Sequence, residues 1–549
     1  MSATLDAESP YAAIAAAAAT YAEHEFLCVP ASATAAYGGK PVVLTYHHAL
    51  SQIDALAERY RAAGLGAGHR VALLLENRPA FFLHWLALNA LGASVVPVNP
   101  DYRRAELAYL LSHSEAVLAV VLSERLGDLA EAVSEAALQL PVIDANTVLA
   151  GLPEIARPAA SHEAGRSSEC ALMYTSGTTG KPKGCLLSNE YFVLMGRRYL
   201  DRRGYVRLEP GRSRVLTPLP MFHMNAMAGS TMGMVMSGGC VIQLDRFHPR
   251  TWWRDVAETR ATGIHCLGVM PAILLGLPPA PEETAHCVRY GTAANVDPLH
   301  HEAFERRFGF PLIEGWAMTE TGAGAAISAD DEPRHLGTRC FGKPSAAVEY
   351  RLVDDAGNDV GDGEPGELLV RRAGPDPRRG FFSGYLKDDA ATAAGWAGGW
   401  WHTGDVARRW EDGTLHFVDR RKNVIRRSGE NISALEVEEM LRHHPLVAQA
   451  AVTGVDDPVR GEEVMACIVS PASAGAREAR AIFDWAMERT AYYKCPGWIA
   501  FVPELPVTAT QKLQRGALKA LAANVLAGNA CFDLRPLKRR TTPREKEPT

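Results

Sequence analysis

The residues of this chain that are best suited to chemistry lie in one stretch, Tyr174-Thr-Ser-Gly-Thr-Thr-Gly-Lys-Pro-Lys-Gly184. Hydroxyl side chains, glycines and two lysines are concentrated here, directly after the apolar run Cys170–Met173. Glycine lets a backbone approach a ligand closely, so such a loop can turn N–H, hydroxyl and ammonium groups toward a polyanion. It is not a Walker loop, because neither Gly177 nor Thr179 begins the G-x-x-x-x-G-K-[ST] spacing. We predict a phosphate-binding loop, with a flexible Gly/Thr turn as the alternative.

Five further stretches carry residues suited to the chemistry of a nucleotide and an acid. In chain order they are Pro220-Met-Phe-His-Met224, Gly315-Trp-Ala-Met-Thr-Glu320, Trp401-His-Thr-Gly-Asp405, Asp419-Arg-Arg-Lys422 with Ser428-Gly-Glu-Asn-Ile432, and Thr508-Ala-Thr-Gln-Lys-Leu513. With the first stretch they resemble, in the same order, the motifs of the adenylate-forming superfamily, which includes AMP-forming acyl-CoA synthetases. Phe381-Phe-Ser-Gly-Tyr385 and the block from Asp419 to Ile432 look most like carnitine/crotonobetaine-type small-acid CoA ligases.

This resemblance implies a ligation in two steps. A carboxylate attacks the α-phosphorus of ATP to give an acyl-adenylate and pyrophosphate, and the thiol of coenzyme A then displaces AMP. Each step develops negative charge that positioned cations and hydrogen-bond donors stabilise. The implied cofactors are ATP, Mg²⁺ and coenzyme A, and the expected partner is a small carboxylic acid.

The resemblance implies an ATP site that is formed by residues of several motifs. Thr319 is expected to donate to the α-phosphate, and Glu320 to carry Mg²⁺, a hard cation that prefers oxygen ligands. Trp316, where the family usually has tyrosine, is expected to lie against the adenine, and Asp405 to bind the ribose. The other residues expected to bind ATP or AMP are Thr175, Ser176, Gly177, Thr178, Thr179, Lys183, Thr292, Ala293 and Arg420, with Lys181 as a helper.

Two lysines are expected to act in adenylation and in the change to the second step. In the family a lysine like Lys512 bridges the attacking carboxylate and the α-phosphate, a task suited to a point charge on a flexible stem. Lys422 falls at the family's hinge. The resemblance implies that the C-terminal domain rotates there after adenylation, which withdraws Lys512 and brings Ser428, Gly429 and Glu430 to the thiol path.

The acyl pocket is expected next to His223, which falls at the family's gate between this pocket and the thiol path. A swinging aromatic gate is preferred over a general base for this residue. The residues expected around the pocket are His223, Asn225, Met227, Ala228, Cys266, Gly268, Thr292 and Gly315. They include no lysine or arginine, which favours a monocarboxylate, although several of them could instead belong to the core.

The elements that must position these residues alternate between helix and strand. Apolar residues recur at helical spacing between Thr45 and Gly64, and apolar runs typical of strands follow at 70–75, 93–97, 116–122 and 141–143. Strands separated by helices indicate parallel βαβ units. The same alternation resumes from about 189 to 337.

Beyond this region, short strands expected at 347–353, 366–371 and 414–418 are separated by Asp-Gly and Ala-Gly turns, which is typical of an antiparallel β subdomain. A basic run at 419–427 then precedes a helix at 434–441. We therefore predict an α/β multi-domain fold. Its parts are an N-terminal AMP-binding domain over 1–419 with two α/β subdomains and a small β subdomain, a hinge at 420–423, a small mobile α+β C-terminal domain over 424–533, and a basic tail without fixed structure over 534–549.

The composition agrees with a large globular protein. The chain has 549 residues, too many for one hydrophobic core, and a net charge of -6 that gives no reason to expect nucleic acid as a partner. Its 10 cysteines include no C-x-x-C pair, so neither a disulfide framework nor a zinc ribbon is indicated. The alanine-rich run at 12–20 follows Asp6 and Glu8 rather than basic residues, which favours a first helix over a signal peptide. With no long apolar run, we expect a cytoplasmic protein without a membrane partner.

Two other functions stay open on the sequence alone. A free-standing adenylation enzyme would load the acid onto a separate carrier protein instead of coenzyme A. A non-catalytic nucleotide-binding or sensory protein would have lost the phosphate loop, Glu320 or Lys512, and all three are present. The sequence does not identify the acid, and it leaves the oligomeric state open, with a homodimer as one alternative.

Overall fold

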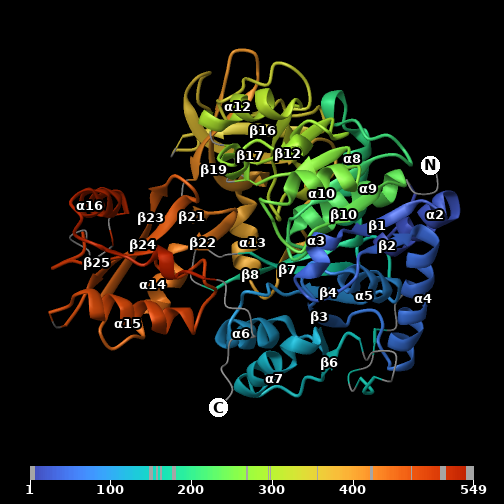
Figure 1. Cartoon of the computed structure of the whole chain (residues 1–549), viewed down its shortest axis with the longest axis horizontal. Helices are drawn as coiled ribbons and strands as arrows, with labels where there is room; N and C mark the ends of the chain where they lie inside the picture. The colour runs from blue at the N-terminus through green and yellow to red at the C-terminus, as the bar shows by residue number, and fades with distance from the viewer. Residues whose placement is uncertain are drawn as a thin grey trace.

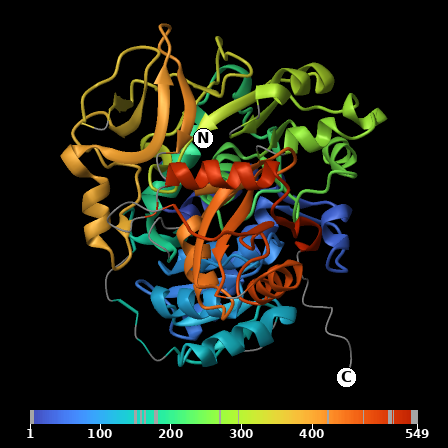
Figure 2. The same ribbon diagram turned by 90° about the vertical axis from the view of Figure 1, so that its left-hand side faces the viewer.

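The computed structural model describes residues 6–146, 152–155, 157, 159–160, 164–175, 181–267, 270–294, 296, 298–354, 356–420, 424–471, 473–506, 513 and 515–539. Figure 1 shows a large N-terminal body, coloured from blue through yellow to light orange, beside a smaller C-terminal body in darker orange and red. Figure 2 turns the smaller body toward the viewer, in front of the larger one. Within these residues, no helix is both long enough and apolar enough to cross a membrane.

The first sheet of the large body is mostly parallel. Its strands are β3 (Arg70–Leu74), β4 (Ser94–Pro97), β5 (Leu118–Val121), β6 (Val142–Asp144), β7 (Glu169–Thr175), β8 (Lys183–Ser188) and β18 (Gly384–Tyr385). They lie in the order β18-β8-β7-β4-β3-β5-β6, and the pairs from β7 to β6 are parallel, as the predicted alternation requires. Strand β8 runs antiparallel to β7, so the predicted phosphate loop falls between two strands of a hairpin.

The second sheet contains strands from two distant parts of the chain. They are β1 (Glu25–Val29), β2 (Val42–Thr45), β9 (Arg214–Thr217), β10 (Cys240–Gln243), β11 (Gly263–His265), β12 (Tyr290–Ala293), β13 (Leu312–Trp316) and β14 (Ile327–Ser328), in the order β14-β13-β12-β11-β9-β10-β1-β2. The layer predicted over 189–337 is therefore completed by an N-terminal hairpin, because β1 pairs in parallel with β10. Local periodicity could not show this pairing.

Helices cover both faces of the first sheet. On strand β3, Val71 and Leu73 face one core cluster, while Ala72 and Leu74 face another that includes the apolar side chains of α6 and α7. Both faces are thus buried, which explains the continuous apolar run of this strand. The helices of the large body are α2 (Pro10–Tyr21), α3 (Ala31–Ala35), α4 (Tyr46–Ala62), α5 (Pro79–Ala90), α6 (Arg104–Ser114), α7 (Leu126–Glu135), α8 (Asn189–Asp201), α9 (Met232–Ser237), α10 (Trp252–Glu258), α11 (Met270–Leu275), α12 (Pro298–Phe308) and α13 (Asp389–Gly395).

Helix α4 illustrates how the sequence sets these boundaries. The Thr45 hydroxyl accepts a hydrogen bond from the backbone N–H of His48 and so caps the first turn. Ile53, Leu56 and Tyr60 are buried along one face, as their helical spacing predicts. Gly64 then adopts a φ of 87°, which lets the chain turn away from the helix.

The third sheet forms the predicted antiparallel β subdomain. Its strands are β16 (Val348–Val353), β17 (Pro365–Arg372), β19 (Trp401–Arg409), β20 (Leu415–Arg420) and β15 (Cys340–Gly342). All of the pairs along this sheet are antiparallel. The register places Asp405 of β19 opposite Arg420 of β20.

The small C-terminal body packs helices against a mixed sheet. Its strands are β21 (Val424–Arg427), β22 (Glu430–Ser433), β23 (Gln449–Asp457), β24 (Gly461–Val469), β25 (Trp498–Phe501) and β26 (Phe532–Asp533), and its helices are α14 (Ala434–Arg442), α15 (Ala476–Met487) and α16 (Arg515–Ala527). It has its own apolar clusters, separate from the core of the large body. This is the behaviour of an independent domain.

The prediction of a tail without fixed structure is wrong for residues 534–539. Strand β26 pairs with β25, the short helix η8 (Arg535–Leu537) follows, and Lys538 is buried in the C-terminal domain. Its ammonium group donates to Glu463 at 2.6 Å and to the carbonyl oxygen of Tyr493 at 3.2 Å. Basic composition indicated a solvated tail, but this lysine has a buried carboxylate partner. Residues 540–549 lie outside the described residues.

Candidate active site

The predicted adenine and ribose residues touch each other directly. Strand β13 carries Trp316 and strand β19 carries Asp405, and the indole Nε1–H donates to Asp405 Oδ2 at 2.9 Å. Both residues are buried, at 8% and 2% exposure. The turn before Asp405 is fixed because the Thr403 hydroxyl accepts from the Asp405 backbone N–H and donates to the Leu368 carbonyl. A carboxylate held in this way can accept hydrogen bonds from two ribose hydroxyls.

Two tyrosines hold the predicted metal and α-phosphate residues. Glu320 is buried, and the Tyr385 hydroxyl donates to its Oε1 at 2.8 Å. The Tyr191 hydroxyl donates to the backbone carbonyl of Thr319 at 2.9 Å. Both tyrosines were missed by the sequence analysis. Tyr385 lies in the stretch Phe381–Tyr385, which served there only to indicate the subgroup of CoA ligases.

The described flanks of the predicted phosphate loop carry its two lysines. Lys183 of β8 lies 3.0 Å from Asp388 and 4.8 Å from the centre of the Tyr385 ring. Lys181 lies 5.2 Å from the centre of the Tyr109 ring, and Thr175 ends β7 with its hydroxyl 3.8 Å from the Cys185 sulfur. Lys183 and Glu320 therefore share one neighbour, the side chain of Tyr385.

A buried carboxyl group that sequence reasoning missed precedes Trp316. Glu314 pairs in register with Ala293 of β12, and its Oε1 accepts from the Val296 backbone N–H at 2.6 Å. Burial raises the pKa of Glu314 to about 7, although His301, this N–H and Arg339 oppose the shift. Next to Ala293, the buried Thr292 hydroxyl has no hydrogen-bond partner among the described residues. The ends of β12 and β13 therefore offer polar groups to the predicted adenine side.

The described residues predicted around the acyl group lie on or next to strands of the second sheet and on or before the π-helix η4 (Asn225–Thr231). Met227, Ala228 and Cys266 are buried, and Gly315 borders the Ser328 side chain. Asn225 accepts from the Tyr199 hydroxyl at 3.4 Å. The region combines buried apolar side chains with the Asn225 amide and the Tyr199 hydroxyl. A π-helix is a frequent mark of a functional site.

The C-terminal domain brings the predicted thiol-path turn to the predicted gate. Ser428 and Gly429 adopt positive φ values of 50° and 87° between β21 and β22. Glu430 Oε2 lies 3.8 Å from His223 Nε2. Glycine adopts the φ of Gly429 without strain, and a Cβ at this position would lie 2.6 Å from Leu267 Cδ1, so that the leucine side chain would have to move. Gly429 therefore lies in direct reach of Leu267 in the large domain.

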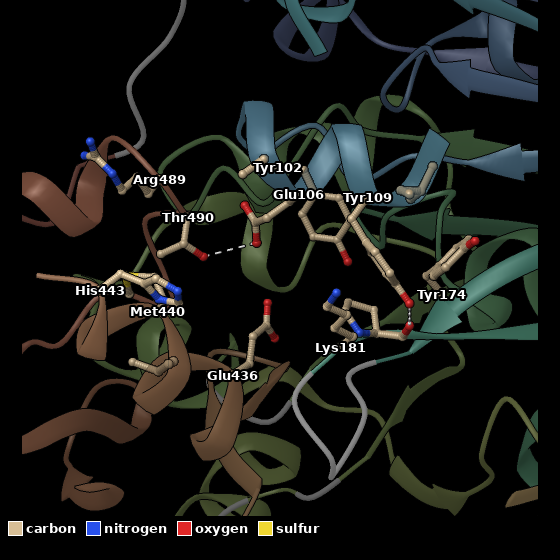
Figure 3. A pocket seen from close by; sticks show the side chains of 14 residues that line it. Tyr102, Glu106, Tyr109, Tyr174, Lys181, Glu436, Met440, His443, Arg489 and Thr490 are labelled. Carbon is tan, nitrogen blue, oxygen red and sulfur yellow. Dashed lines mark hydrogen bonds between the residues drawn. The ribbon is translucent and has the colours of Figure 1, made fainter. Parts of the chain in front are cut away.

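A cavity of about 250 Å³ lies between the domains, beside the predicted nucleotide site rather than within it. Figure 3 shows Tyr102, just before α6, with Glu106 and Tyr109 of α6 on one side, Glu436 and Met440 of α14 on the other, and Lys181 and Tyr174 closing one end. Since its walls come from both domains, the cavity depends on their present arrangement.

Some of the predicted site residues lie outside the described residues, and their roles remain predictions. They are Ser176, Gly177, Thr178, Thr179, Gly268, Lys422 and Lys512. The side chain of Arg420 is likewise not described, although its strand places it opposite Asp405.

Comparison with known proteins gives matches along most of the chain. The family model described as AMP-binding enzyme matches residues 16–386, and the AMP-binding enzyme C-terminal domain matches 436–512. A sulfoacetate–CoA ligase of Cupriavidus necator is 33% identical over 518 residues, covering 92% of this chain and 96% of the relative. A crotonobetaine/carnitine–CoA ligase of Citrobacter koseri is 29% identical, covering 85% and 91%.

One solved relative is similar in two forms. A double mutant of the o-succinylbenzoate CoA synthetase of Bacillus subtilis, bound to its product analogue OSB-NCoA, has a TM-score of 0.78 at 26% identity and covers 94% of this chain and 99% of its own. The same synthetase with the acyl-adenylate intermediate OSB-AMP has a TM-score of 0.63 at 26% identity, covering 93% and 98%. The arrangement of this chain is therefore more similar to the form that holds the CoA product analogue.

Proposed function

This chain belongs to the AMP-binding enzyme family, and we infer that it is an AMP-forming acyl-CoA ligase. It activates a carboxylic acid with ATP to an acyl-adenylate and transfers the acyl group to the thiol of coenzyme A. The observation that carries this inference is the full-length similarity to CoA ligases, which extends through both domains. A non-catalytic nucleotide-binding protein is disfavoured, since the chemistry-bearing motifs are retained.

We propose that the nucleotide lies at the junction of the two large sheets with the β subdomain. In this proposal Trp316 lies against the adenine and Asp405 accepts from the ribose. The buried Trp316–Asp405 hydrogen bond supports it, because the two residues can then be ordered before the nucleotide binds. Lys183 and Thr319 hold the phosphates, and Lys512 approaches during adenylation.

Glu320 fits the role proposed for it toward Mg²⁺. Mg²⁺ retains several waters and takes one or two protein carboxylates beside substrate phosphates, so a dedicated cage is not needed. This matches a site in which the described residues hold no cluster of three or more acidic, histidine or cysteine ligands. When bound, the ion would neutralise charge on the phosphates, and Tyr385 would keep the Glu320 carboxylate directed toward it.

We propose a small acid as the substrate, placed against Asn225, Met227 and Ala228, with His223 at its thiol side. Met227 and Ala228 are buried and apolar, and the Asn225 amide, which accepts from Tyr199, can hydrogen-bond a polar substituent. The curated relatives named above act on small acids of different charge, so the acid is left to experiment.

Pyrophosphate release with a panel of short, branched, aromatic, sulfonated and zwitterionic acids tests this function. Each active acid is then incubated with ATP and either coenzyme A or a holo carrier protein. Acyl-CoA formation supports the ligase. Transfer to the carrier protein alone would show that the chain is a free-standing adenylation enzyme. If none of the acids caused pyrophosphate release, both the ligase and the adenylation enzyme would be overturned.

A further inference from the structure

Lys494 lies buried between the two domains and contacts one carboxylate from each. Its ammonium group donates to Glu106 of α6 at 2.8 Å and to Glu436 of α14 at 2.5 Å. The three side chains are 4%, 14% and 16% exposed. Burial opposes the charge, yet Glu106 and Glu436 outweigh it and raise the pKa of Lys494. Lys494 is thus a charged bridge between the domains.

One of the two carboxylates, Glu106, accepts further hydrogen bonds from both domains. Glu106 Oε2 accepts from the Arg103 backbone N–H at 3.0 Å in the first turn of α6, where a helix favours a negative charge. Its Oε1 also accepts from the Thr490 hydroxyl at 3.1 Å. Figure 3 shows Glu106 and Glu436 reaching toward each other from opposite sides of the cavity. Glu106 would lose these contacts if it turned away from Lys494.

The residue next to Lys494 makes a second link of the same kind. The Asn99 amide donates to the Tyr493 hydroxyl at 2.8 Å, in a buried contact between the domains. On the same interface, Gly429 meets Leu267 and Glu430 approaches His223. The ion bridge and the thiol-path turn are therefore made by one docking of the C-terminal domain.

We propose that Lys494 is a positioning residue for the thioester-forming step, because it docks the C-terminal domain in the arrangement that presents Ser428–Glu430 to His223. The proposal rests on the ligase function proposed above. Without the ammonium group, Glu106 and Glu436 would face each other with buried, unbalanced charge, and the docked arrangement would be disfavoured. A C-terminal domain that has rotated away does not make this bridge, so adenylation does not depend on it.

The test compares the two half-reactions in the full-length enzyme and in Lys494→Met. Adenylation is followed by ATP–pyrophosphate exchange, and thioester formation is started from pre-formed acyl-adenylate and coenzyme A. We expect thioester formation to fall by about tenfold or more, and adenylation to change by less than about twofold. The double variant Glu106→Gln/Lys494→Met removes one of the facing charges and should recover part of the thioester rate.

Arg334→Met is the matched control. Arg334 is a buried cation that also serves two carboxylates, Glu305 and Glu332, but all three belong to the large domain. Its loss should lower stability without changing the ratio of the two half-reaction rates. Equal loss of both half-reactions in Lys494→Met, or an unchanged thioester rate, would overturn the proposal.

A second measurement does not depend on activity. Hydrogen–deuterium exchange should increase in α6 and α14 of Lys494→Met and decrease again in the double variant. Unchanged exchange would count against the bridge even if no substrate acid were found. If the wild-type enzyme makes no thioester while exchange responds as expected, the ligase function fails and the docking role of Lys494 stands.

Discussion

At the scale of single residues, the site depends on side chains that lie behind the motif residues. Tyr385 contacts Glu320 and lies beneath Lys183, and Tyr191 holds the backbone of Thr319. None of these contacts is local in sequence. They mark the residues at which substitutions should alter one step without removing a predicted ligand.

Tyr385→Phe should affect adenylation alone. It removes one hydrogen bond to Glu320 while keeping the ring that packs on Phe382 and Trp401. A lost hydrogen bond to a charged group corresponds to about 1.5–3 kcal/mol, so ATP–pyrophosphate exchange should slow by about tenfold or more. The Mg²⁺ concentration for half-maximal exchange should rise. Thioester formation from pre-formed acyl-adenylate should stay near wild type, and an equal loss there would contradict the role.

Glu314→Gln should change how stability depends on pH. The pKa of Glu314 is raised by burial to about 7, so the folded chain binds a proton that the unfolded chain loses above about 4.5. The stability of the wild type therefore declines as the pH rises through this window. Glutamine keeps an acceptor for the Val296 N–H and cannot ionise. We expect the variant to gain about 1–3 kcal/mol relative to wild type between about pH 5 and pH 8, measured by denaturant unfolding. A pH-independent difference would contradict it.

At the scale of elements, the short segment β26–η8 closes the C-terminal domain. Lys538 reaches Glu463, which also pairs with Arg427 just before the thiol-path turn. Through Glu463, the segment therefore helps to hold Arg427 and the hairpin β21–β22 in place. Pairing of β26 with β25 keeps Lys538 in place.

Lys538→Met should destabilise the C-terminal domain by about 1–3 kcal/mol, because Glu463 keeps Arg427 but loses one buried partner. Thermal unfolding measures this loss. Lys343→Met, at an exposed lysine of the large domain, serves as the control and should leave the melting temperature unchanged. Identical melting temperatures for both variants would show that 534–539 behaves as a tail.

At the scale of the whole molecule, the two domains meet in an arrangement similar to the form of a relative that holds a CoA product analogue. The proposed two-step reaction needs a second arrangement, in which Lys512 reaches the α-phosphate. The bridge at Lys494 then contributes to only one of the two. This makes the two half-reactions separable by single substitutions.

Lys512→Ala should abolish adenylation and leave thioester formation largely intact. Removing the ammonium group takes away the charge proposed to stabilise the transition state at phosphorus, which corresponds to a loss of about 100-fold or more. Pyrophosphate exchange and thioester formation from pre-formed acyl-adenylate measure the two steps. Loss of both steps to the same extent would contradict the rotation of the C-terminal domain.

The sequence by itself determined the fold class, the family and the order of the motifs, because these depend on local patterns such as the strand β7 and the helix α4. Only the tertiary structure decided which distant segments contact one another. The hairpin β1–β2 joins a sheet formed far along the chain, β26 pairs with β25, and Lys538 then reaches Glu463. Lys494 finds Glu106 at a separation of 388 residues. A buried charge is stable only beside its partner, and chain spacing does not show which partner folding will bring to it.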